Sequence, residues 1–185
     1  EMNNSSIPVP ETAAGEMNNS SIPVPETAAG GDGFAAMQQK IKGANIDETT
    51  LLATDYLNHF NEIVMLLEMI PDMPEILDDV KAWQPKSYTD HFKSSTIAEK
   101  DLAIEAYDHV PDIYRQPFEQ TIEQINPMIA STVQRLEKNL ADDSIDVLRA
   151  NAKTLSQLIQ RLMDMASAII HGSSKTMEQS EIDIL

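Results

Sequence analysis

The chain has 185 residues, enough for one domain with tails, and 42% of them are hydrophobic, which allows a packed core and excludes global disorder. A formal net charge of −17 disfavours binding to nucleic acid and to anionic membranes, so a basic patch on a partner protein is the more natural counterpart. The absence of cysteine excludes disulfides, thiolate metal ligands and thiol catalysis, and it is compatible with a cytoplasmic location.

The first thirty residues are one 15-residue sequence written twice. EMNNSSIPVPETAAG occupies 1–15 and recurs without change at 16–30. Its apolar content is too small to offset the entropy of ordering, and Ile-Pro-Val-Pro favours an extended backbone. We therefore expect residues 1–33 to form a flexible tail. The identity of the copies indicates a recent duplication or an artefact, and a pair of linear motifs that bind one partner with avidity is the alternative.

From residue 34 onward, apolar residues recur at spacings of three and four, which is the pattern of amphipathic helices. The pattern predicts a folded domain over 34–171, followed by a flexible C-terminal peptide over 172–185. Its expected elements are helices over about 34–42, 47–70 and 74–83, an irregular segment over 84–94, and a helix over 96–110.

Capping patterns support two of these helices. Asp47 is a good N-cap for the helix over 47–70. Thr96 and Glu99 have the spacing of a capping box, in which each side chain accepts a backbone N–H at the start of a helix.

The clearest apolar stripes lie in the C-terminal part, over 122–140 and 148–169. A short polar turn at 141–144 separates them, so the two helices should pair antiparallel. Pro117 is expected in the first turn of its helix, whereas Pro127 should kink that helix. No segment alternates with period two. The predicted fold class is therefore all-α: a helical bundle of four or more helices with a long C-terminal antiparallel hairpin.

Carboxylates and histidines at helical spacing form the most suggestive polar set. Asp55, His59 and Glu62 share one face of a predicted helix, and Glu105 and His109 lie four apart on another. Two helices that present oxygen and imidazole ligands inward can hold a di-metal site with Fe, Mn or Zn. The order His-x-x-Glu is the reverse of the ferritin-like pattern, however. The other interpretation is that the carboxylates are solvated and that His59 pairs with Asp55.

No catalytic signature in the sequence is complete, which favours a protein without enzymatic activity. The run over 171–174 combines His with Ser but lies in a polar stretch at a helix end, whereas catalysis needs a rigid setting. None of the four histidines has the His-x-x-Lys-Gly pattern of histidine-phosphotransfer domains. The aromatic residues are expected in the core. The methionines are either core filler or an adaptable groove for a partner helix.

The last nine residues, MEQSEIDIL at 177–185, resemble the N-terminal peptide of the flagellar switch protein FliM, whose pattern is close to Leu-Ser-Gln-x-Glu-Ile-Asp-x-Leu-Leu. They resemble more loosely the terminal peptide of the chemotaxis phosphatase CheZ. In those families the peptide folds into a short amphipathic helix on the receiver protein CheY. The matching positions are Gln179, Glu181, Ile182, Asp183 and Leu185.

The body of the chain departs from the phosphatase. Asp112 and Gln116 lie four apart but lack its flanking Thr-Gly pair, so no catalytic residue carries over. The resemblance implies a regulatory or adaptor protein that binds a receiver-type signalling partner. Ile182 and Leu185 would fill an apolar groove, and Asp183 would meet a basic rim. Two alternatives stay open: a metal-binding bundle, and a homodimeric structural bundle.

Overall fold

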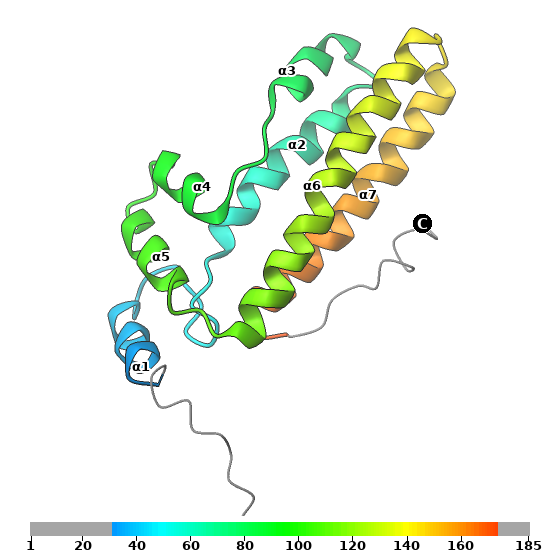
Figure 1. Cartoon of the computed structure of the whole chain (residues 1–185). Coiled ribbons are helices and arrows are strands. Elements are labelled where there is room, and N and C mark those ends of the chain that lie inside the picture. Colours follow the sequence, from blue (N-terminus) through cyan, green and yellow to red (C-terminus); the bar gives the residue numbers. More distant parts are fainter. Residues whose placement is uncertain (1–30, 174–185) are drawn as a thin grey trace, which may run out of the picture.

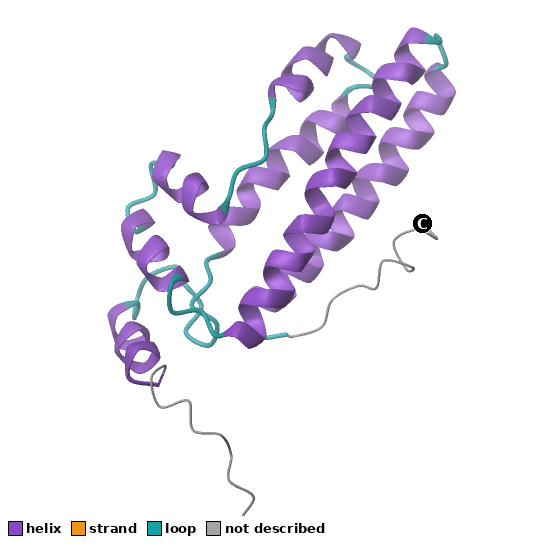
Figure 2. Ribbon diagram, viewed as in Figure 1, coloured by secondary structure: helices purple, strands orange, loops and turns teal. Residues whose placement is uncertain are grey.

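The computed structural model describes residues 31–173, and every regular element within that range is a helix (Figures 1 and 2). The predicted all-α fold class is therefore confirmed. The α-helices are α1 (Gly31–Lys40), α2 (Asn58–Met69), α3 (Leu77–Ala82), α4 (Tyr88–Ser94), α5 (Lys100–Tyr107), α6 (Asp112–Ala141) and α7 (Ile145–Ile170). Two short 3-10 helices, η1 (Thr54–Leu57) and η2 (Pro74–Ile76), precede α2 and α3.

The longest elements, α6 with 30 residues and α7 with 26, form the predicted antiparallel hairpin (Figure 1). Their turn is closed by a bond from the Ser144 N–H to the Asn139 carbonyl at 3.0 Å. The Asn151 amide also donates to the Asn139 side chain at 2.8 Å. Pro117 and Pro127 both lie inside α6, and the helix continues through them.

Helix α2 packs lengthwise on this hairpin and completes the core (Figure 1). Phe60, Ile63 and Leu67 recur at spacings of three and four and are fully buried. Helix α3 lies over α6, where Lys81 Nζ forms an ion pair with Glu137 at 2.6 Å. The bundle is thus held mainly by apolar contacts between α2, α6 and α7.

The shorter helices α4 and α5 pack together near the start of α6 (Figure 1). The ring of Tyr88 in α4 stacks on that of Tyr107 in α5 at 4.4 Å. Helix α1 is tied to α5 by an ion pair of 2.6 Å between Lys40 and Glu105. These contacts build a second, aromatic-rich part of the core beside the long hairpin.

The prediction of one helix over 47–70 is wrong in its first third. Residues 47–53 form a loop that is buried from Thr50 onward, and the regular helix α2 begins only at Asn58. Asp47 does not cap that helix: its Oδ1 accepts the N–H groups of Thr49 and Thr50 at 2.8 and 3.1 Å and closes a turn. Leu51 follows with φ of 65°, a left-handed conformation that ends any helix begun at Asp47.

Two further boundaries differ from the sequence-based expectation. The segment over 84–94 is not irregular throughout, because α4 occupies its second half. The Ser87 hydroxyl caps α4 by accepting the Asp90 N–H at 3.1 Å. The capping box expected at Thr96 and Glu99 does not form. Glu99 itself stands at the N-cap position of α5, with no side-chain capping bond.

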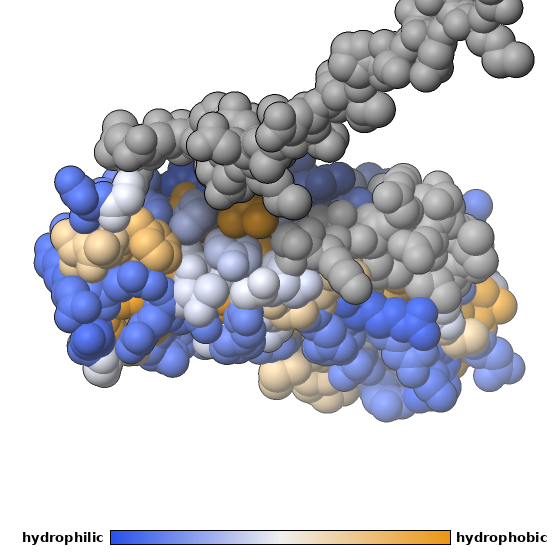
Figure 3. Space-filling model, turned by 90° about the horizontal axis from the view of Figure 1, so that it is seen from below, coloured by the Kyte–Doolittle hydropathy of each residue, from blue (hydrophilic) through white to orange (hydrophobic). Residues whose placement is uncertain are grey.

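The exposed face in Figure 3 is mostly hydrophilic, with apolar side chains confined to separate patches. Within residues 31–173, no helix combines the length and the apolar character that a bilayer crossing requires. The duplicated 15-mer and all of the terminal peptide after Ser173 lie outside the described residues. The predicted domain limits therefore stay predictions at both ends.

Candidate functional site

The five residues of the hypothetical metal site are not brought together by the fold. Asp55 accepts a hydrogen bond from the Asn45 amide at 2.9 Å, and Glu62 is exposed on α2. Glu105 is held in its ion pair with Lys40. Among residues 31–173, no three His, Asp or Glu side chains converge on a point that could hold a metal ion.

The two histidines of that set lie in different surroundings. His109 packs beside Gly33 in α1, where an added Cβ would approach its Nδ1 to 3.1 Å. His59 is buried and does not pair with the Asp55 carboxylate, so that part of the alternative interpretation is wrong, whereas Glu62 is solvated as that interpretation expects. Instead the His59 ring stacks on the indole of Trp83, with centroids 4.6 Å apart and an interplanar angle of 20°.

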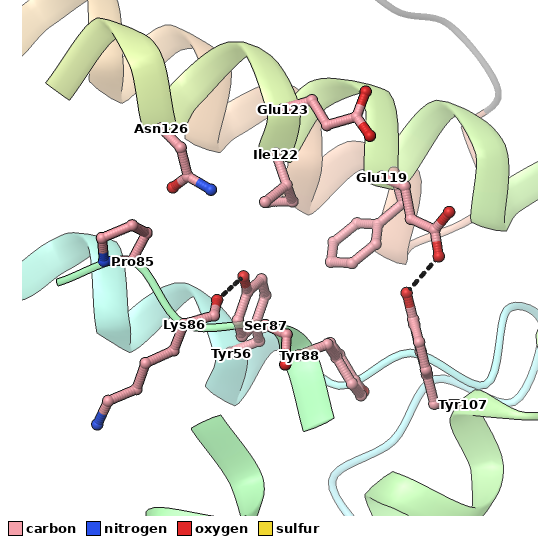
Figure 4. Close-up of a pocket in the computed structure, with 11 residues that line it drawn as sticks. Tyr56, Pro85, Lys86, Ser87, Tyr88, Tyr107, Glu119, Ile122, Glu123 and Asn126 are labelled. Carbon is pink, nitrogen blue, oxygen red and sulfur yellow. Dashed lines mark hydrogen bonds between the residues drawn. The ribbon is translucent and has the colours of Figure 1, made fainter. Parts of the chain in front are cut away.

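A cavity of about 400 Å³ lies between α6 and the segment that joins α3 to α4 (Figure 4). Figure 4 shows α6 on one side and the segment over 85–88 on the other. The cavity combines aromatic walls with carboxylate, amide and hydroxyl groups. Its lining residues are Tyr56, Pro85, Lys86, Ser87, Tyr88, Tyr107, Phe118, Glu119, Ile122, Glu123 and Asn126.

The wall over 83–87 has no regular structure, so its backbone polar groups need partners from elsewhere. The peptide groups of Lys86 find them on two side chains three residues apart. The Tyr56 hydroxyl donates to the Lys86 carbonyl at 2.7 Å, drawn as a dashed line in Figure 4. The Lys86 N–H donates to His59 Nε2 at 3.1 Å. One residue of η1 and one at the start of α2 thus fix the position of this wall.

Further bonds fasten the wall on both sides of Lys86. The indole N–H of Trp83 donates to the His59 carbonyl at 3.1 Å. The Tyr88 hydroxyl accepts the Ala53 N–H at 2.8 Å. Each of these aromatic side chains buries its ring and uses its polar atom to satisfy a backbone group. The cavity wall is therefore rigidly placed, although it is irregular.

The interior side of the cavity is aromatic. The Tyr56 ring lies 5.3 Å from that of Tyr88 and 6.0 Å from that of Phe118, centroid to centroid. Burial raises the pKa of Tyr56, Tyr88 and Tyr107 well above the usual value of a phenol, so all three hydroxyls are protonated at neutral pH. They act as neutral hydrogen-bonding groups.

The charged groups lie at the edge of the cavity. Glu119 accepts the Tyr107 hydroxyl at 2.7 Å (Figure 4). Glu123, one turn further along α6, is exposed and has no hydrogen bond or ion pair within the described part of the chain. Lys86 turns its ammonium away from the cavity (Figure 4) and bonds the Ser94 hydroxyl at 3.2 Å.

Two imidazoles lie behind the wall, that of the buried His59 and that of the half-buried His91, with ring centroids 5.9 Å apart. Desolvation, together with the smaller effect of the neighbouring His91, lowers the pKa of His59 to about 4. Burial likewise lowers the pKa of His91, against the opposing effect of a hydrogen bond to the Asp55 backbone. Both rings are neutral at pH 7, as acceptance of the Lys86 N–H by His59 requires. His91 Nε2 is buried, and no residue within 31–173 forms a hydrogen bond with it.

Sequence reasoning placed these aromatic residues in the core and assigned them no site. What could have drawn attention to this region is the concentration of Trp83, Tyr88 and His91 around Pro85, since polar tips on buried rings need partners. The residues of the terminal peptide, by contrast, lie outside the described residues. No protein-family model matches this chain, and the searches of curated proteins and of solved structures gave no significant match.

Proposed function

We propose that the protein is a non-enzymatic regulatory or adaptor protein, and that its helical domain presents the peptide over 177–185 to a receiver-type signalling protein. The observation that carries the proposal is the agreement of that peptide with the receiver-binding pattern of flagellar switch proteins. The agreeing positions are Gln179, Glu181, Ile182, Asp183 and Leu185.

The point at which the chain leaves the domain supports this proposal. The Thr50 hydroxyl, which is fully buried, donates to the carbonyl of Ile170 at 2.6 Å. Gly172, with φ of 103°, and the bond from the Ser173 N–H to the Ala168 carbonyl at 2.9 Å close the last turn of α7. Only residues 174–176 separate Ser173 from the peptide, so the proposed motif follows the last helix of the domain almost directly in the sequence.

The chemistry of the peptide matches helix-in-groove recognition. Ile182 and Leu185 are three apart and share one face of a helix, and Glu178 and Glu181 stand toward its N-terminus, where acidic groups are favoured. The strongly acidic chain also attracts a partner with a basic rim.

Calorimetric titration of the full chain against receiver proteins of the CheY type tests the proposal. We expect binding that the double substitution Ile182→Ala with Leu185→Ala removes, and that the matched control Ser180→Ala, at a variable position of the pattern, leaves unchanged. A synthetic peptide covering 173–185 should bind the same receiver. An absence of binding at millimolar concentration, for both chain and peptide, would end this proposal.

A second candidate function, self-association of the bundle, is favoured by exposed methionines in the second half of α2 and just beyond its end. Met65, Met69 and Met73 follow each other at intervals of four and are 61%, 40% and 41% exposed. Exposed apolar side chains at this spacing suit a contact between copies. Sedimentation at several concentrations would detect a dimer that Met65→Glu with Met69→Glu dissociates. Ile113→Glu, at a 63% exposed site on α6, is the control.

A further inference from the structure

We propose that the cavity between α6 and the segment over 83–88 binds an organic cation: an ammonium group carried on a short aliphatic or aryl chain. The chain would lie against the aromatic walls and the ammonium beside the carboxylates at the opening. The volume of about 400 Å³ falls in the range of pockets that hold small ligands.

The walls suit the apolar part of such a ligand. Tyr56, Phe118 and Ile122 face the cavity from two different elements, η1 and α6. Their rings and methyl groups offer an apolar surface. The opposite wall is held in place by the bonds of Tyr56 and His59 to the Lys86 backbone, so the shape of the cavity exists before a ligand enters. Little entropy of the protein is therefore lost on binding.

The charges at the opening select a cation. Glu119 and Glu123 stand one turn apart on α6, and both line the cavity. Lys86 does not neutralise them, because its ammonium is bonded to Ser94 and points away. The net charge of −17 raises the local concentration of any cation.

Arg115 shows that a cation is accommodated beside this aromatic group. Its guanidinium carbon lies 4.8 Å from the centre of the Tyr107 ring, a cation–π distance, and it also donates to the Tyr107 carbonyl. Since Tyr107 in turn donates to Glu119, the fold already combines an aromatic face, a carboxylate and a positive group within a few residues.

Asn126 supplies a polar group on the far side of the cavity. Its side chain points from α6 toward the opposite wall in Figure 4. The Oδ1 atom is buried and has no hydrogen-bond partner within residues 31–173. This free acceptor suits a ligand whose chain carries a further N–H or O–H group at the end opposite the ammonium.

Titration of the full, isotope-labelled chain with 2-phenylethylammonium, followed by NMR, tests the proposal. We expect shifts concentrated around Tyr56, Phe118 and Ile122, and binding at least about fivefold tighter than that of the neutral isostere 2-phenylethanol. Raising the salt concentration should weaken the binding of 2-phenylethylammonium but not that of 2-phenylethanol. Equal affinity for the two compounds would refute the proposal.

Two charge variants distinguish specific binding in the cavity from nonspecific attraction of a cation to the acidic surface. Glu119→Gln with Glu123→Gln should weaken the cation about fivefold, whereas Glu75→Gln with Asp146→Asn makes the same change of charge at exposed positions elsewhere and should have little effect. Ile122→Trp should fill the cavity and block both compounds. Equal losses in the two charge variants would mean that the binding is unspecific and would overturn the proposal.

The ammonium group could belong to a free amine or to a lysine side chain of a protein. A pentapeptide with one central lysine and blocked ends, titrated in the same way, distinguishes the two sources. Binding of both probes at the same residues assigns the cavity to lysine-containing partners. Binding of the free amine alone assigns it to small amines. If neither probe shifts the residues that line the cavity, the proposal is wrong, while the binding of receivers by the terminal peptide is unaffected.

Discussion

The His59 ring accepts the backbone N–H of Lys86 at 3.1 Å, across 27 positions of the sequence. An imidazole can accept at that nitrogen only when the nitrogen is unprotonated. The bond therefore links the placement of the cavity wall to the protonation state of a buried side chain.

Acidification should destabilise the protein through this bond. The pKa of His59 is lowered to about 4 in the folded chain, whereas an unfolded histidine has its ordinary value of 6.5. Between these values the unfolded state binds the proton more strongly, so the stabilisation is complete above about pH 6.5 and is lost as the pH falls toward 4. The loss should be about 2 to 3 kcal/mol. Urea unfolding at pH 7, 5.5 and 4.5 measures it.

The substitution His59→Gln provides the comparison for that experiment. An amide oxygen can accept a hydrogen bond but does not titrate, so the pH dependence should become shallower. His109→Gln, at a position that takes no part in the wall, should keep the steeper dependence. A variant at His59 with an unchanged slope would show that other groups govern the acid response.

Removal of the Tyr56 hydroxyl should loosen the cavity wall. Tyr56→Phe leaves the ring in place but leaves the Lys86 carbonyl without its donor, at an expected cost of about 1 to 2 kcal/mol of unfolding free energy. Tyr114→Phe is the matched control, because Tyr114 is only half-buried and its hydroxyl makes no hydrogen bond in the described structure. Amide exchange should accelerate around residue 86 in the first variant and stay unchanged in the second.

Substitution of Thr50 should weaken the end of α7. Thr50→Val keeps the shape of the side chain and removes the buried donor of the Ile170 carbonyl, which should cost about 1 to 2 kcal/mol. Thr49→Val, at the exposed neighbour, should cost less than about 0.5 kcal/mol. Thermal denaturation followed by circular dichroism compares the two, and equal losses would contradict the role assigned to Thr50.

Truncation in the core should have the largest effect. Phe60→Ala removes a fully buried ring from the contact between α2 and the hairpin, with an expected loss of about 3 to 5 kcal/mol. Ile113→Ala, at an exposed site, should change stability by less than about 0.5 kcal/mol. Denaturant unfolding of both variants tests whether the apolar stripe of α2 stabilises the fold as the structure indicates.

The sequence predicted the long hairpin because both of its helices carry regular apolar stripes and are joined by a polar turn. It failed where tertiary contacts override local signals. Asp47 looks like a helix cap, yet its carboxylate closes a turn, since burial of Leu51 and Leu52 requires a loop at that place. Thr96 and Glu99 have capping spacing, but α5 starts only after them.

The cavity could not be predicted from the periodic pattern of apolar residues. Its wall over 83–87 has no repeating pattern, and the partners of that wall, Tyr56 in η1 and His59 in α2, lie about 30 residues earlier in the chain. The metal hypothesis failed for a related reason. Spacing along one helix shows which residues share a face of that helix. It does not show which faces of two different helices pack together, and Glu105 pairs with Lys40 instead of lying near His59.

The way the cavity wall is held determines which of its positions can vary among related sequences. Lys86 contributes its peptide group to the wall, while its own side chain and that of Gln84 are exposed. Evolution is therefore free to exchange the side chains at 84 and 86 for almost any residue other than proline at 86. Tyr56 and His59, in contrast, should be inherited together, because they bind the backbone C=O and N–H of the same residue, and the loss of either leaves only one of these two groups held.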